Sequence, residues 1–216
     1  MSNFIQYLIA LGTPQETLIY ILMLPLVATL ITFARQVIGI KGFGMFSPLL
    51  LIFAFVISGL KYGLIILGVV LITGSLIRLV LKGRRLMYLP RIALVLALVT
   101  VVILAMLTVG GLLGQRNFLQ VSILPLLIII ALVEEFVAVQ LKMRLKMATI
   151  LTLETLALAI IGYFLVSWPF LQSLVLVYPF WILGLALVIN WLLGKWTGLR
   201  LTELYRFRRV IAQGKT

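Results

Sequence analysis

The feature that most constrains this chain is a series of seven long apolar stretches, separated by short polar gaps. A hydrocarbon core about 30 Å thick is crossed by a helix of about 20 mainly apolar residues. The stretches cover residues 18–34, 43–60, 62–81, 92–113, 118–139, 147–168 and 170–193. They predict an all-α polytopic membrane protein with seven transmembrane helices, in which 62–81 and 170–193 each follow their predecessor through a tight turn.

The cations alternate with these stretches. Of the 18 Lys and Arg residues, all but Lys61 and Arg116 lie at the ends that follow the first, third, fifth and seventh stretches. Because basic residues stay on the cytoplasmic side, this asymmetry predicts a multi-pass protein of the bacterial inner membrane with its N-terminus outside and its C-terminus inside. That orientation requires an odd number of crossings, which agrees with seven.

Three parts follow from this pattern: a short extracytoplasmic segment at 1–17, a seven-helix membrane domain at 18–193, and a basic cytoplasmic tail at 194–216. The tail is expected to lie along the inner leaflet, with docking of a cytoplasmic partner as the alternative. The net charge of +13 sits at membrane ends. Anionic lipid is therefore the expected counterpart, and no nucleic acid is expected.

An internal repeat is one way to read the order of the stretches. Leu24-Pro25-Leu26 in the first stretch recurs as Leu124-Pro125-Leu126 in the fifth. The first three and last three stretches would run in the same directions, with the fourth as a connector, as in transporters built from parallel repeats. The alternative is that prolines are simply tolerated in membrane helices. A 3+1+3 parallel repeat therefore stays open.

Missing residue types exclude most catalytic chemistry. The chain has no His and no Cys, and its five acidic residues are all Glu. A zinc site of the usual kind and a Ser–His or Cys–His nucleophile are excluded. We therefore expect no catalytic residues, no metal site and no cofactor, and do not expect an enzyme.

The most informative side chains are three glutamates inside apolar stretches, because a carboxylate in hydrocarbon is costly unless it is paired, protonated or near water. With neighbouring cations they form the predicted polar cluster: Arg35, Arg91, Glu134, Glu135 and Glu154. One interpretation is a pocket open to the cytoplasm that binds a substrate, a proton or a partner. The other is a buried ion-pair network that fixes helix packing, with Arg35 paired to Glu135.

Three weaker candidates accompany the cluster. Arg78 lies at a similar expected depth, and Asn190 is more typical of an interhelical hydrogen-bond donor than of a ligand. The segment 35–48 (RQVIGIKGFGMFSP) contains three glycines and two cations that could receive an anion. Its spacing fits no phosphate loop, so a tight inner turn is favoured, with Ser47-Pro48 bending the second helix.

Several short motifs together resemble a known family. They are RQVIGIKGFG at 35–44, LPR at 89–91, SILP at 122–125 followed by EEF at 134–136, ET at 154–155, and GLRLTE at 198–203 with RFR at 206–208. In order and spacing they resemble the bacterial seven-transmembrane domain usually fused to an inactive transglutaminase-like domain. A looser similarity is to the membrane subunit of poly-gamma-glutamate synthesis. The transglutaminase-like domain is expected on a separate chain, if one takes part.

The resemblance implies a cytoplasmic ATP-grasp ligase-like partner, since members of the family are thought to be encoded beside such ligases. The expected function is then a non-catalytic inner-membrane component of an ATP-grasp-linked peptide or amide-ligase system, as product path or membrane scaffold. The alternative is a self-sufficient secondary transporter with a Glu-lined polar site, in which two halves rock about that site. A purely structural anchor is the third interpretation.

Overall fold

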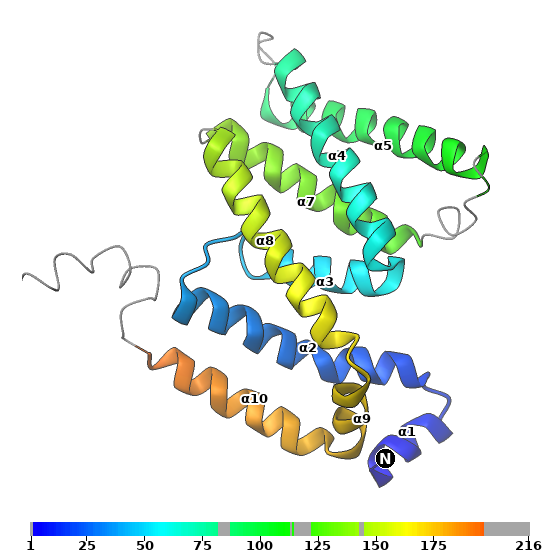
Figure 1. Ribbon diagram of the computed structural model, residues 1–216, viewed down its shortest axis with the longest axis vertical. Coiled ribbons are helices and arrows are strands. Elements are labelled where there is room, and N and C mark those ends of the chain that lie inside the picture. The colour runs from blue at the N-terminus through cyan, green and yellow to red at the C-terminus, as the bar shows by residue number, and fades with distance from the viewer. Residues whose placement is uncertain (1, 82–86, 113, 115–121, 143–144, 197–216) are drawn as a thin grey trace, which may run out of the picture. The chain divides into compact units, whose positions relative to one another are not determined.

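The computed structural model describes residues 2–81, 87–112, 114, 122–142 and 145–196 (Figure 1). Every regular element in these ranges is helical, which confirms the all-α prediction. The elements are α1 (Asn3–Ala10), α2 (Gln15–Phe33), the π-helix η1 (Ala34–Ile38), α3 (Phe46–Ser58), α4 (Leu60–Leu81), α5 (Tyr88–Leu112), α7 (Ile123–Lys142), α8 (Leu145–Val166), α9 (Pro169–Val177) and α10 (Pro179–Gly194).

Four helical segments in the described ranges are long and apolar enough to cross a membrane. They are Gln15–Ile38, Leu60–Ile77, Ala93–Leu112 and Lys146–Val166, and the bent pair α9 and α10 would make a fifth. The helix α3 has 13 residues, or about 20 Å at 1.5 Å per residue, which is shorter than the hydrocarbon core. The chain is a polytopic membrane protein by these criteria, and the count of seven crossings stays a prediction.

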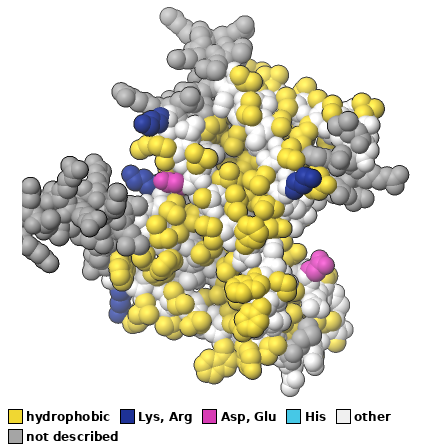
Figure 2. All heavy atoms as spheres, viewed as in Figure 1, with side chains coloured by type: hydrophobic (Ala, Val, Ile, Leu, Met, Phe, Trp, Pro, Cys, Tyr) yellow, Lys and Arg dark blue, Asp and Glu magenta, His cyan; other side chains and the backbone are white. Residues whose placement is uncertain are grey.

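The outward-facing side chains are those of a membrane protein. Figure 2 shows hydrophobic side chains over much of the visible surface. Trp181 is 80% exposed and Leu187 is 73% exposed. Contiguous apolar surface of this kind is unfavourable in water, whereas lipid tails solvate it without cost.

The sequence predicted one continuous helix for the seventh stretch, and this prediction is wrong. It is divided into α9 and α10, whose axes differ by 104°. The break follows from Pro179, which has no N–H and whose ring clashes with the carbonyl four residues earlier in a continuous helix. Tyr178 leaves helical geometry, with φ −125° and ψ 57°, and Pro179 becomes the first residue of α10.

The contacts divide the chain into two compact units. Unit 1 comprises Met1–Met45 and Phe164–Thr216. In it α2 and α10 run side by side, and α9 contacts α2 (Figure 1). The helix α1 joins this unit because Ser2 N–H donates to the Leu176 carbonyl at 3.1 Å. The Phe4 ring lies 5.3 Å from that of Phe180.

Unit 2 comprises Phe46–Tyr163 and contains α3, α4, α5, α7 and most of α8. Here α7 packs on both α3 and α4, and α5 packs on α4 (Figure 1). Small residues allow the close approach, as is usual between membrane helices. A Cβ atom placed at Gly74 of α4 would lie 2.9 Å from Cγ1 of Val133 and 3.3 Å from Cγ2 of Val137. The α4–α7 contact therefore depends on a glycine at position 74.

Alanine substitutions at two glycines of α4 test this dependence. Gly74→Ala forces α7 away, and overpacking of this kind costs about 1–3 kcal/mol. At Gly68 an added Cβ meets nothing within 4 Å, so Gly68→Ala keeps only the gain in helix propensity. We expect Gly74→Ala to lower the unfolding free energy, measured by circular dichroism in mixed micelles, and Gly68→Ala not to lower it. Equal stability of the two variants would contradict the packing described here.

Candidate polar site

A hydrogen bond between two helices of unit 2 holds one of the predicted glutamates. The hydroxyl of Ser47, in the first turn of α3, donates to Oε2 of Glu135 in α7. Both side chains are partly buried, and the two helices pack against each other. A carboxylate inside a helix contact thus has a donor from the neighbouring helix, which lowers the cost of placing it there.

The other two glutamates are placed in the same unit. Glu134 and Glu154 are both partly buried, and Glu154 has an interaction partner of its own. Successive residues of a helix point about 100° apart, so Glu134 does not share the direction of Glu135. Within the described ranges, no three acidic side chains come close enough together to hold a metal ion. The three glutamates therefore do not form a metal site together.

Arg35 belongs to unit 1, in the π-helix η1. Its Nη1 atom is buried and has no hydrogen-bond partner in the described part of the chain. A buried guanidinium nitrogen without an acceptor is costly, and π-helical turns are often found at functional sites. Since Glu135 lies in unit 2, its expected pairing with Arg35 stays a prediction.

A glycine-rich turn follows η1, as the sequence predicted. Gly39, Gly42 and Gly44 have positive φ angles of 94°, 44° and 34°, which glycine adopts without strain. Both Gly39 N–H and Ile40 N–H donate to the Ala34 carbonyl, at 3.0 and 3.2 Å.

Pro48 does not bend the middle of a helix, contrary to the expectation. The helix α3 begins only at Phe46, three residues later than predicted, so Pro48 stands in its first turn. There the missing N–H has no intrahelical partner to lose.

Two predicted residues and the tail can be located only in part. Arg78 lies in α4 and Arg91 in α5, but their side chains lie outside the described residues, as does the tail from 197 onward. Their membership of the polar cluster stays a prediction.

Asn190 takes the interhelical role that was favoured for it. Its Nδ2 donates to Oγ1 of Thr29 at 2.6 Å and to the carbonyl of Ala186 at 2.8 Å. The Thr29 hydroxyl in turn donates to the Pro25 carbonyl at 2.7 Å. The Asn190 amide nitrogen and the Thr29 hydroxyl therefore each donate to an oxygen acceptor. The contact joins α10 to α2 inside unit 1.

Comparison with known families matches residues 2–211 to a family described as seven transmembrane helices usually fused to an inactive transglutaminase. The chain belongs to this family. No curated protein and no solved structure matches it.

The match bears on the candidate site of this transglutaminase-associated membrane protein. It covers Arg35, Ser47 and the three glutamates of α7 and α8. The description assigns no role to any of them. Sequence reasoning found Glu135 but missed its partner, because Ser47 was considered only with Pro48. A serine at the start of a helix, near the expected depth of the glutamates, was the available signal.

Removing the Ser47 hydroxyl measures how much its hydrogen bond to Glu135 stabilises the contact between α3 and α7. Interhelical hydrogen bonds in membranes contribute about 0.6 kcal/mol on average and at most about 1.7, so Ser47→Ala should lower the unfolding free energy in mixed micelles by an amount in that range. Ser58 is the matched control in α3, because its hydroxyl donates to the Ala54 carbonyl of its own helix at 2.7 Å. Ser58→Ala should change stability little. If both variants unfold alike, the Ser47–Glu135 bond contributes nothing to the contact.

Proposed function

We propose that this protein is the non-catalytic membrane component of a system in which an ATP-grasp ligase makes a peptide or amide product. The observation that carries the proposal is membership of a family whose usual fusion partner is described as an inactive transglutaminase. A membrane domain paired with an inactive enzyme fold is consistent with a role in binding or scaffolding. The lack of His and Cys in the chain agrees with this role.

The proposed arrangement places the ligase in the cytoplasm of a bacterium and this chain in the inner membrane, with its N-terminus outside. The charge asymmetry of the sequence supports that orientation. A transglutaminase-like domain, on this chain's partner or elsewhere, would then act on the outer side. The basic tail at 194–216 is the segment that such a ligase would meet first on the cytoplasmic side.

Within this role, the polar cluster would line a product path or form a partner contact. The Ser47–Glu135 bond supports a defined position for one carboxylate. Among the residues that the structure describes, Nη1 of Arg35 has no partner, which supports free donor capacity at a second position. A peptide-like product carries carboxylates, which Arg binds well, and amide N–H groups, from which a Glu side chain can accept hydrogen bonds.

A secondary transporter is the second candidate, and one observation favours it. The pair α9 and α10 is a broken apolar segment, bent by 104°. Discontinuous membrane helices commonly surround transporter binding sites. In that case the chain alone would move its substrate.

Two assays separate these functions. Affinity-purified full-length protein should bring down an ATP-grasp ligase-like protein from its native host, identified by mass spectrometry. The variant that ends at residue 193 should bring down much less. Glu135→Gln, which keeps an acceptor but removes the charge, should reduce product output while the protein still accumulates in the membrane. The proposal would be wrong if the protein with its intact tail recovered no ligase and liposomes containing this chain alone took up substrate. These two results together would support the transporter function instead.

A further inference from the structure

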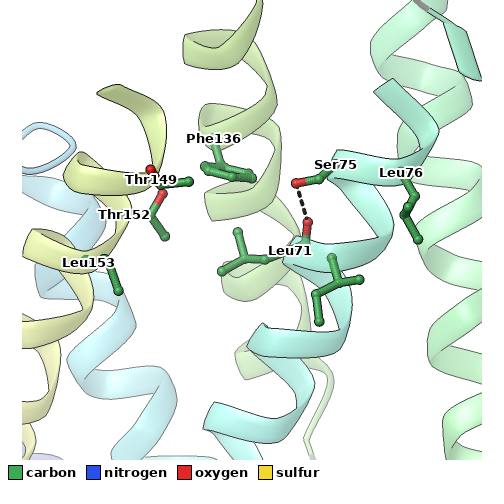
Figure 3. A pocket seen from close by; sticks show the side chains of 8 residues that line it. Leu71, Ser75, Leu76, Phe136, Thr149, Thr152 and Leu153 are labelled. Carbon is green, nitrogen blue, oxygen red and sulfur yellow. Dashed lines mark hydrogen bonds between the residues drawn. The ribbon is translucent and has the colours of Figure 1, made fainter. Parts of the chain in front are cut away.

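An open apolar groove lies in unit 2, outside the polar site. It encloses about 420 Å³ between α4, α7 and α8. The residues that line it are Leu71, Ile72, Ser75, Leu76, Phe136, Thr149, Thr152 and Leu153. Figure 3 shows Phe136 of α7 between the side chains of α4 and those of α8.

The groove contains three hydroxyl groups, but each one donates to its own helix. Ser75 donates to the Leu71 carbonyl at 2.9 Å, the dashed line in Figure 3. Thr149 donates to the Lys146 carbonyl at 2.9 Å, and Thr152 donates to that of Ala148 at 2.9 Å. With their protons committed, these hydroxyls add little to binding a polar ligand, and the remaining wall is hydrocarbon. The groove therefore suits an alkyl chain.

Of the three helices around the groove, α4 and α8 contain segments long and apolar enough to cross the membrane. Large hydrophobic residues of the groove remain exposed, with Ile72 at 63% and Leu153 at 64%. The groove thus opens outward along membrane-crossing helices, where lipid acyl chains are the surrounding solvent.

A cation stands at one end of the groove. Lys146 is exposed and precedes Thr149 by three residues in α8, which places both on the same side of that helix. The rim on this side therefore carries a positive charge, and the residues that line the groove carry none.

We propose that this groove binds one acyl chain of an anionic phospholipid, whose phosphate is held at the level of Lys146. The apolar lining selects the chain, and Lys146 selects the charge of the headgroup. A cation near the membrane surface favours an anionic over a zwitterionic lipid by about fivefold in affinity. The preference is therefore a property of the groove, distinct from the general solvation of the protein by lipid.

Photo-crosslinking tests the proposal on the full chain in vesicles. The probe is phosphatidylglycerol with a diazirine on one acyl chain, in a phosphatidylcholine background, with adducts mapped by mass spectrometry. We expect adducts to concentrate on residues 71–76 and 149–153. Excess unlabelled phosphatidylglycerol should displace them, and excess phosphatidylcholine should not. Ile161, 53% exposed and also in α8, lies outside the groove and reports random labelling.

Charge variants supply the second readout. Lys146→Gln should reduce groove adducts about fivefold relative to Ile161, whereas Lys146→Arg should leave them unchanged. Lys146 is exposed, so neither substitution disturbs packing. The adduct positions in the wild-type protein test the proposal independently of these variants. Adducts spread evenly over groove and Ile161, or equal displacement by both lipids, would overturn the proposal. So would groove adducts that persist unchanged in Lys146→Gln.

Discussion

In hydrocarbon, each unpaired backbone N–H or C=O costs several kcal/mol, and no water is present to satisfy it. The helices of this chain and the exceptions to them follow from that constraint. In α2, the Thr29 hydroxyl donates to the Pro25 carbonyl and accepts from Nδ2 of Asn190 in α10. After α2, the π-helix η1 ends where the N–H groups of Gly39 and Ile40 both donate to the Ala34 carbonyl.

The same rule governs side chains. Inside unit 2, Glu135 accepts a hydrogen bond from a hydroxyl of α3. Inside unit 1, Asn190 donates one to a hydroxyl of α2. Interhelical hydrogen bonds of this kind are worth about 0.6 kcal/mol on average in membranes, so they orient helices more than they drive association. Close packing at Gly74 contributes the remaining specificity in unit 2. Arg35 differs from both, because one of its buried nitrogens has no partner in the described ranges.

The sequence predicted the helical fold, most helix positions and the family, because long apolar runs leave few alternatives in a bilayer. It also predicted the interhelical role of Asn190. It did not predict the break at Tyr178, although Pro179 was a readable signal, because apolarity alone does not distinguish one crossing from two shorter helices. The partner of Glu135 was missed for a different reason. Ser47 lies 88 residues away in the chain, and only the packing of α3 on α7 brings the two together.

Cysteine labelling tests most directly the central claim that the membrane sorts the cations to one side. The chain has no Cys, so single variants at Gln15, Lys61 and Lys195 report without background. An impermeant maleimide applied to intact cells should label Gln15→Cys and Lys61→Cys, and should label Lys195→Cys only after permeabilisation. Labelling of Lys195→Cys in intact cells, or protection of Gln15→Cys, would contradict the orientation and the odd number of crossings.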